Sequence, residues 1–267
     1  MNLRHFCVIM AGNGQSFLRA TYNRYLKIVP PENILVVTLE ASRDAVRAEL
    51  PELPDENLLL EPISRGTAPC MTYAVYTILQ RCPDAIIVAT PSDHVIQDEK
   101  LYISTVNEAI AYVSEHDVLM TIGLLPAYPD ANFGYIQVRE GKLAWKLRRP
   151  LEVKTFTEKP SVELARIFIK TGEFFWNSGI FVWRARTIRE ELEFYLPEVT
   201  ELFGGWETRL QDPQFIQHAY SECPRISLDN GIMERTGRAW LYPARFGWED
   251  HGRDKVSVSD QPDVLKA

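Results

Sequence analysis

The chain has 267 residues, of which 46% are hydrophobic and 24% charged, and its formal net charge is −7. These values are typical of one large α/β domain, or of one domain with a small appendage, with a sizeable core. The negative charge argues against a nucleic-acid backbone as partner. An acidic chain that binds phosphates needs local Lys or Arg side chains, backbone N–H groups or a metal ion to do so.

The cysteines form no CxxC pair and no metal-ligand spacing; they are Cys7, Cys70, Cys82 and Cys223. Cys7 and Cys70 stand in apolar surroundings and are expected in the core. This usage indicates a reducing, cytoplasmic compartment. The first ten residues contain Arg4, His5 and only a brief apolar run, too short for a signal peptide or a membrane helix. We therefore expect no membrane association.

In the first half of the chain, short apolar runs alternate with segments of helical periodicity. The expected strands are 6–10, 34–39, 58–60, 85–89 and 118–123. The expected helices are 16–29, 42–50, 67–82 and about 101–115. This alternation predicts an open, mostly parallel, doubly wound sheet.

After about Pro126 the expected strands are shorter and lie among turns. They cover 134–138, 153–157, 179–183 and 240–242, with helices at 162–170, 188–195, 199–203 and 214–221. Because there is no repeat, low-complexity tract or flexible linker, we expect the second half to be woven onto the first rather than to form a separate domain.

The apolar run 85–89 is followed by Pro91-Ser92-Asp93-His94. The run is rich in Ile and Val, and its apolar residues do not alternate with polar ones. This pattern predicts a strand that is buried on both faces of the sheet. In parallel sheets, ligands bind beyond the carboxyl ends of the strands, so an Asp there could hold a hard cation and a phosphate. Taken alone, Asp93 could equally be a turn or cap residue.

Seven short motifs follow one another along the chain: EPISRGTAP (61–69), PSDH (91–94), FGYI (133–136), FTEKP (156–160), WNSGIF (176–181), SLDNGIME (227–234) and GWEDHG (247–252). Their order resembles that of the sugar-1-phosphate nucleotidylyltransferases, whose patterns are EPxxRNTAP, PxDH, GYI, Phe-x-EKP, WNSGIF, SIDxxxME and GWxDxG. The resemblance runs from about Phe6 to Gly252. The first and fifth motifs point to the mannose/guanosine branch rather than the glucose/thymidine branch.

The resemblance implies a Rossmann-like nucleotidyltransferase fold over residues 1–252 and a C-terminal tail at 253–267. Nucleotide would bind to the part at about 1–125 and sugar phosphate to the part at about 126–252. The implied reaction makes GDP-mannose and pyrophosphate from GTP and mannose 1-phosphate, with Mg²⁺ as cofactor. A transferase for another sugar 1-phosphate stays open as an alternative. GTP and mannose 1-phosphate are the implied partners, and a homodimer is compatible with the resemblance.

The resemblance also implies roles for individual residues. The expected catalytic residues are Asp93, Lys159 and Asp250, of which Asp93 and Asp250 would together hold Mg²⁺ and Lys159 would pair with the sugar phosphate. The expected sugar-binding residues are Gly134, Glu158, Lys159, Asn177 and Gly179. The expected nucleotide-binding residues are Ala11, Gly12, Glu61, Arg65, Thr67, Ala68 and Ser92, with the turn from Glu61 to Ala68 facing the guanine.

Simpler interpretations exist for several of these residues. Lys159 could be a solvated surface residue, Asn177 a turn residue and Asp250 a loop acid. Asp229, at the expected start of a helix, could be a cap. His94 either orients the loop of Asp93 or touches substrate. We do not expect it to be a general base, because a phosphate monoester nucleophile is already ionised.

The chain departs from the family after its first strand. The family carries a glycine-rich loop, roughly GGxGxRxxPxSxxxPKQ, that cradles the triphosphate, whereas here Val8–Gly12 runs directly into residues 13–18. Either this sequence omits a segment of the protein, or the loop is absent and catalysis is lost; the second alternative is a regulatory protein that binds nucleotide sugars without turnover. Gly66 stands where the family usually has Asn. The residues after Gly252 lack the expected aromatic continuation.

Overall fold

The computed structural model describes residues 4–12, 17–141 and 146–251. The strands are β1 (His5–Ala11), β2 (Ile34–Leu39), β3 (Leu58–Glu61), β4 (Ile86–Pro91), β5 (His94–Ile96), β6 (Leu119–Leu124), β7 (Tyr135–Val138), β8 (Leu151–Thr157), β9 (Phe174–Arg184), β10 (Ala239–Ala244) and β11 (Trp248–Asp250). The α-helices are α1 (Leu18–Tyr25), α2 (Arg43–Glu49), α3 (Thr67–Arg81), α4 (Glu99–Val113), α5 (Val162–Thr171), α6 (Ala185–Tyr195), α7 (Pro197–Thr200), α8 (Trp206–Arg209) and α9 (Pro213–Glu222). A π-helix, η6 (Asp229–Met233), follows α9.

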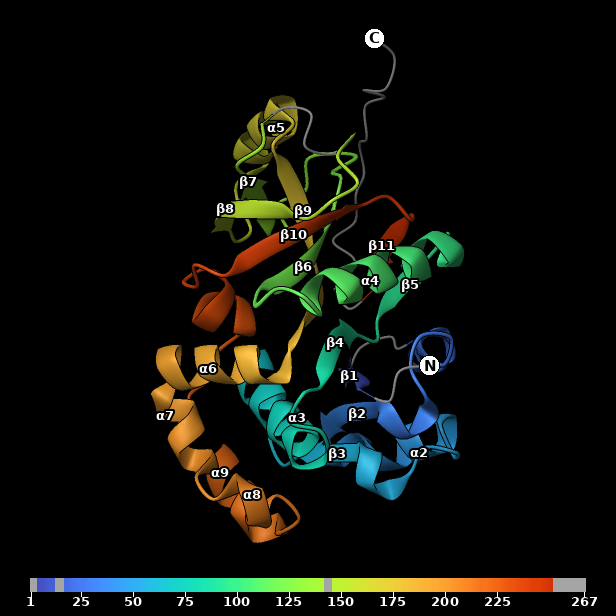
Figure 1. Ribbon diagram of the computed structural model, residues 1–267, viewed down its shortest axis with the longest axis vertical. Coiled ribbons are helices and arrows are strands. Elements are labelled where there is room, and N and C mark those ends of the chain that lie inside the picture. Colours follow the sequence, from blue (N-terminus) through green and yellow to red (C-terminus); the bar gives the residue numbers. More distant parts are fainter. Residues whose placement is uncertain (1–3, 13–16, 142–145, 252–267) are drawn as a thin grey trace.

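A nine-stranded sheet runs through the molecule in the order β3-β2-β1-β4-β9-β6-β10-β8-β7 (Figure 1). Strands β3, β2, β1 and β4 are parallel, and β10 is parallel to β6. Strand β9 is antiparallel to both of its neighbours β4 and β6, and β8 is antiparallel to β10 and β7. The expected mostly parallel α/β sheet is therefore confirmed, with β9 from the second half inserted between two strands of the first.

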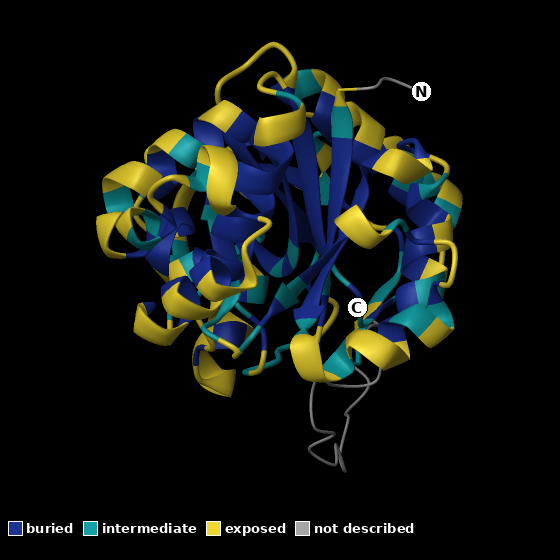
Figure 2. Cartoon of the chain, turned by 90° about the horizontal axis from the view of Figure 1, so that it is seen from below, coloured by how far each residue is buried: buried dark blue, intermediate teal, exposed yellow. Residues whose placement is uncertain are grey.

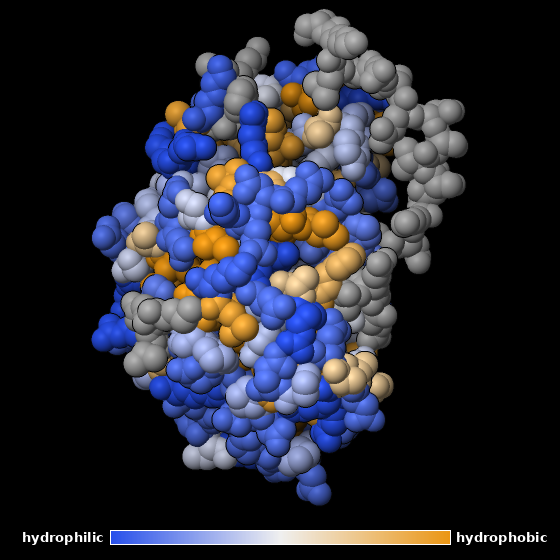
Figure 3. All heavy atoms as spheres, turned by 90° about the vertical axis from the view of Figure 1, so that its right-hand side faces the viewer, coloured by the Kyte–Doolittle hydropathy of each residue, from blue (hydrophilic) through white to orange (hydrophobic). Residues whose placement is uncertain are grey.

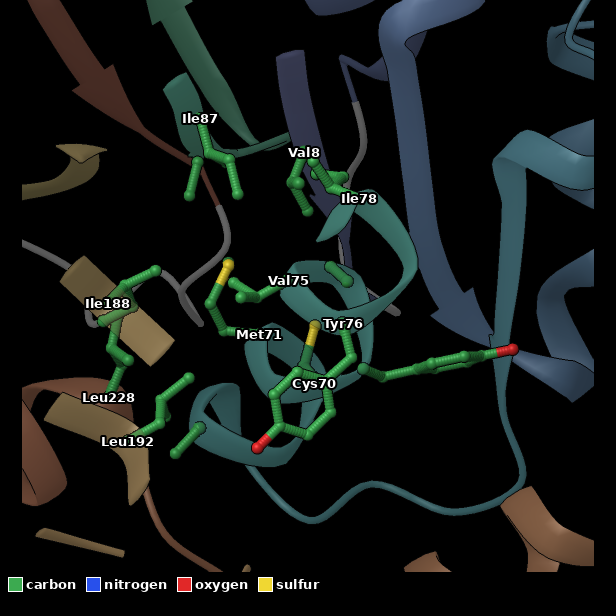
Figure 4. Close-up of a cluster of buried hydrophobic side chains, with 14 of the residues drawn as sticks. Val8, Cys70, Met71, Val75, Tyr76, Ile78, Ile87, Ile188, Leu192 and Leu228 are labelled. Carbon is green, nitrogen blue, oxygen red and sulfur yellow. The ribbon is translucent and has the colours of Figure 1, made fainter. Parts of the chain in front are cut away.

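The central strands are largely apolar because helices cover both faces of the sheet. In β1, Phe6 and Val8 contribute to one buried cluster and Cys7 and Ile9 to another. Figure 2 shows the strands as a buried layer between helices whose outer faces are exposed. Figure 4 shows Met71, Val75 and other side chains of α3 inside the first cluster. Cys70 belongs to the same cluster, so both cysteines expected in the core are buried.

The structure differs from the expected elements at several places, including these three. Helix α1 ends at Tyr25, short of the expected residue 29, and turns fill the interval before Pro30. Strand β9 begins at Phe174 rather than at 179, because the WNSGIF motif is itself extended. The pair β5–β11 forms a two-stranded sheet that the sequence did not predict. Each of these two strands has only three residues, too few for alternation to be recognised.

The surface is mostly hydrophilic on the face shown in Figure 3, where apolar side chains form small separate patches. The exposed large apolar residues among those described are Ile63, Tyr128, Val162, Leu164, Ile167 and Phe194. Within the described ranges, none of the helices has the length and apolar character needed to span a bilayer.

Candidate functional site

Three candidate metal ligands meet just beyond the carboxyl end of β4. Asp93 follows that strand, and the antiparallel pairing of β11 with β5 sets Asp250 opposite His94. One ligand atom from each of Asp93, His94 and Asp250 lies within 4.8 Å of the other two. The backbone N–H of His251 donates to the carbonyl oxygen of Asp93 at 3.0 Å, which holds the end of β11 against this loop. Carboxylate oxygens suit hard divalent cations, so this group could hold one.

His94 is buried, with its Nε2 3.6 Å from Oδ1 of Asp93. Its ring packs edge-on against Trp248, with the ring centroids 5.2 Å apart. Imidazole nitrogen is a better ligand for transition ions than for Mg²⁺. The buried ring lies against the loop of Asp93, as expected if it orients that loop.

A second group consists of Gly134, Glu158, Lys159 and Asn177, which we call the sugar cluster because the sequence predicts that these residues bind the sugar phosphate. The register of β7 with β8 and β9 brings its members together, because Tyr135 pairs with Thr157 on one side and Trp176 on the other. The backbone N–H of Asn177 donates to the carbonyl of Gly134 at 2.9 Å. A Cβ on Gly134 would lie 2.8 Å from Oε2 of Glu158, so glycine lets this carboxylate approach the backbone without shifting.

Lys159 is the one non-glycine residue among those described with a positive φ, at 42°. Such a conformation is uncommon for a side-chain-bearing residue and is found where surrounding structure imposes it. Its Nζ lies 3.4 Å from Oε1 of Glu158, and its side chain is 61% exposed. The ammonium group is thus held beside Glu158 and is accessible to an anion from solvent.

Contacts between aromatic rings connect the candidate metal ligands with the sugar cluster. Phe133 lies 4.8 Å from Trp176 and 5.1 Å from Trp248, measured between ring centroids. The three rings belong to three different motifs. Phe133 immediately precedes Gly134, Trp176 immediately precedes Asn177, and Trp248 lies two residues before Asp250. Gly179, with φ +68°, allows a second contact, since its Cβ would lie only 3.3 Å from Cγ of Pro91. Packing therefore fixes the sugar cluster relative to Asp93 and Asp250.

Asp229 belongs to this site although the sequence suggested only a cap. Its Oδ1 accepts a hydrogen bond from Nδ2 of Asn177 at 2.7 Å, and Oδ1 of Asn177 accepts one from the N–H of Gly179 at 3.1 Å. Burial raises the pKa of Asp229 to about 6, and the hydrogen bond from Asn177 offsets part of that rise. The SLDNGIME motif contained the residue, but only the three-dimensional structure shows its partner.

The turn at residues 61–68, which we call the nucleotide turn, uses several of its side chains for internal contacts. Arg65 donates through Nε to the carbonyl of Tyr220 at 2.9 Å and through a terminal nitrogen to that of Ser221 at 2.7 Å. The hydroxyl of Thr67 accepts from the N–H of Leu228 at 2.8 Å, and Ala68 is fully buried. These contacts hold the turn in place.

Glu61 is 9% exposed, and burial raises its pKa to about 7. Ser92 is also buried; its N–H donates to the carbonyl of Met10 and its own carbonyl accepts from Phe17. The carbonyl of Ala11 accepts from the hydroxyl of Thr38. Of the residues expected to bind nucleotide at the end of β1, Gly12 alone is exposed.

Residues 13–16, where the sequence departs from the glycine-rich loop of the family, lie outside the described residues. So do Gly252 and the expected tail at 253–267.

A cavity of about 500 Å³ lies at the opposite edge of the sheet, near the start of β1 and the end of β9. Its most buried cation, Arg184, already donates to the carbonyls of Val113 and Ser114 and to Asp117. No motif residue lines this cavity. The site at the carboxyl edge is therefore the better candidate.

The nucleotidyl transferase family model matches residues 8–256. This chain belongs to the nucleotidyl transferase family. It is 34% identical to a mannose-1-phosphate guanylyltransferase of Escherichia coli K12 over 83% of this chain and 48% of that protein. It is 32% identical to one of Salmonella montevideo over 89% of this chain and 51% of that protein. The chain thus spans about half the length of the curated relatives it matches.

The structure also resembles a solved member of the same group. The crystal structure of a mannose-1-phosphate geranyltransferase from Thermus thermophilus aligns with a TM-score of 0.79 at 27% identity, covering 93% of this chain and 76% of that chain. The Rossmann-like nucleotidyl transferase fold expected from the motifs is therefore confirmed.

Proposed function

We propose that this chain transfers the guanylyl group of GTP to mannose 1-phosphate. A phosphate oxygen of the sugar 1-phosphate attacks the α-phosphorus, the bond from that phosphorus to the bridging oxygen of the β-phosphate breaks, and pyrophosphate leaves. The observation that carries the proposal is the placement of the sugar cluster beside Asp93 and Asp250 at the carboxyl edge of the sheet. The 34% identity to a mannose-1-phosphate guanylyltransferase supports this choice of substrates.

The proposed sugar contacts come from the second half of the chain. Lys159 would pair with the phosphate dianion as a point charge. Glu158 and Asn177 would hydrogen-bond the hydroxyls, with Gly134 giving a main-chain group close access. Gly179 would hold the amide oxygen of Asn177 in place. Because both reactants are anions, a fixed cation beside the sugar phosphate would lower the electrostatic cost of bringing them together.

The proposed nucleotide contacts come from the first half, with Ala11 and Gly12 at the end of β1 and Glu61 in the nucleotide turn. A buried carboxyl such as Glu61 can accept hydrogen bonds from a base that carries paired N–H donors, which guanine does. Thr67, Arg65, Ala68 and Ser92 would support these contacts by holding the nucleotide turn and the end of β4 in place. We therefore propose that nucleotide binds mainly to residues 1–125 and sugar phosphate mainly to residues 126–252.

Asp93 and Asp250 would hold the divalent cation, for which we propose Mg²⁺ because their donors are carboxylate oxygens. The ion would neutralise charge on the reacting phosphates when bound. The chain's own contribution is to bring two carboxylates from distant segments to one place through the β5–β11 pairing.

A second candidate function follows from one observation. Only residues 12–17 connect β1 to α1, too few for the glycine-rich loop of the family. A protein with this short connection could bind a nucleotide sugar and regulate without turnover. An intact mass of 30.7 kDa for the purified protein would establish that the loop is absent.

A pyrophosphate-release assay with several NTPs and sugar 1-phosphates tests the proposed activity. We expect turnover with GTP and mannose 1-phosphate, and at least about a hundredfold lower kcat in Asp93→Asn or Asp250→Asn, as for loss of one electrostatic stabiliser. Asp55→Asn, at a side chain that is 96% exposed and precedes β3, is the control. Turnover of dTTP with glucose 1-phosphate instead would contradict the specificity. Binding of GDP-mannose without any turnover would favour the regulatory function.

A further inference from the structure

The amide of Asn177 is fixed in one orientation. Its Nδ2 donates to Asp229 at 2.7 Å, while its Oδ1 accepts from the N–H of Gly179 at 3.1 Å. An amide has only two orientations about its terminal bond, and exchanging them here would place NH₂ against an N–H donor and oxygen against a carboxyl. The hydrogen bonds to Asp229 and to Gly179 therefore together fix the orientation of the Asn177 amide within the sugar cluster.

Asp229 is in turn held by the segment that precedes it. Residues 220–229 run from the end of α9 into η6, and they carry the acceptors and donors that bind the nucleotide turn. The N–H of Ile226 donates to the carbonyl of Arg65 at 3.0 Å, and the N–H of Ala68 donates back to the carbonyl of Ile226 at 3.2 Å. The N–H of Leu228, next to Asp229, donates to the hydroxyl of Thr67 at 2.8 Å.

Gly66 makes this close docking sterically feasible. It has φ +85°, and a Cβ there would lie 2.4 Å from the carbonyl oxygen of Ile226. Any side chain at this position would force the nucleotide turn and the 220–229 segment apart. Gly66, which stands where the family usually has Asn, therefore permits the close contact with the backbone of Ile226 in this chain.

We infer that Asp229 is a positioning residue for Asn177, and that the nucleotide turn sets its position through Thr67 and Ile226. The turn proposed to face the nucleotide and the amide proposed to face the sugar form one hydrogen-bonded unit. A change in the turn would then alter sugar recognition without touching the sugar. The assignment of ligands to the two sides rests on the proposed function, whereas the hydrogen-bonded unit itself does not.

The first test uses the ligand-free protein. The side-chain ¹⁵N–¹H signals of Asn177 are identified by their loss in Asn177→Ala. We expect Asp229→Ala to shift these signals and to speed their exchange with water. Asp229→Asn keeps an acceptor oxygen and should leave them closer to wild type. Unchanged signals in Asp229→Ala would overturn the positioning role.

The second test examines the connection to the nucleotide turn. Thr67→Val removes the hydroxyl at nearly constant volume, and Gly66→Ala adds the clashing Cβ; both should shift the Asn177 signals. The control is Gly141→Ala, because Gly141 also has a positive φ, +78°, but no atom within 4 Å of its Cβ position. If Thr67→Val and Gly66→Ala disturb Asn177 no more than Gly141→Ala does, the two sides are not connected.

The third test is a double-variant cycle on sugar-phosphate binding, measured by calorimetry with mannose 1-phosphate. Loss of a hydrogen bond to a charged group predicts about a tenfold weaker Kd in Asp229→Ala, with GTP binding unchanged. In the Asn177→Ala background the same change should have little further effect, because Asp229 acts through Asn177. Additive losses would overturn the inference. A wild-type protein that binds no sugar phosphate would contradict the proposed function and leave the signal-shift result standing.

Discussion

Lys159 is the residue whose charge most directly separates binding of the two proposed substrates. Its exposed ammonium group lies beside Glu158, in the second half of the chain. We expect Lys159→Ala to weaken mannose 1-phosphate binding by about tenfold or more, because a charge-assisted contact to a phosphate is lost. GTP binding should be nearly unchanged. Lys154→Ala, an exposed lysine on the preceding strand, is the matched control. Calorimetric titration of each ligand separately measures both constants, and loss of GTP binding alone would reverse the assignment of the two halves.

The buried carboxyl of Glu61 predicts how the free energy of unfolding depends on pH. Burial raises its pKa to about 7 from the ordinary value of 4.5, so the folded chain holds this proton more tightly than the unfolded chain does. The free energy of unfolding therefore falls as pH rises between these values, by about 2 to 3 kcal/mol from this group. In Glu61→Gln that pH dependence should be lost. Urea denaturation of both proteins at pH 5 and pH 8 measures it, and equal pH dependence in the two would contradict the assignment.

Among the elements, the short β5–β11 pair is what brings Asp250 to Asp93. Its geometry depends on Gly247, which has φ +64° and whose Cβ would lie 2.5 Å from Oε1 of Gln97. We expect Gly247→Ala to weaken binding of Mg²⁺ or Mn²⁺ by about tenfold, since a shift of about 1 Å is large against metal–ligand distances of about 2.1 Å. The core of the nine-stranded sheet should keep its thermal midpoint within a few degrees. Metal titration and thermal unfolding measure these effects; unchanged metal affinity would show that β11 does not position Asp250.

The bounds of an element could be predicted from the sequence wherever its buried residues form one regular apolar run. The range 34–39 was predicted to the residue as β2, because its apolar run is bounded by Pro30-Pro31 and by polar residues. The β5–β11 pair and the extension of β9 through Asn177 were not predictable, because their pairing depends on partners far along the chain. For the same reason, the roles of Arg65 and Asp229 became apparent only when the end of α9 was seen against the nucleotide turn.

For the whole molecule, the motif order predicted the fold and the edge of the sheet that carries the site. It could not predict how the halves interleave. Strand β9, which carries Asn177, lies between β4 and β6 and is hydrogen-bonded to both. A rigid-body hinge between the halves would have to break these ladders, at a cost of about 1 kcal/mol for each hydrogen bond. In the proposed reaction, water would then be excluded from the phosphates by rearrangement of loops and side chains above the sheet, rather than by the closing of two lobes about a hinge.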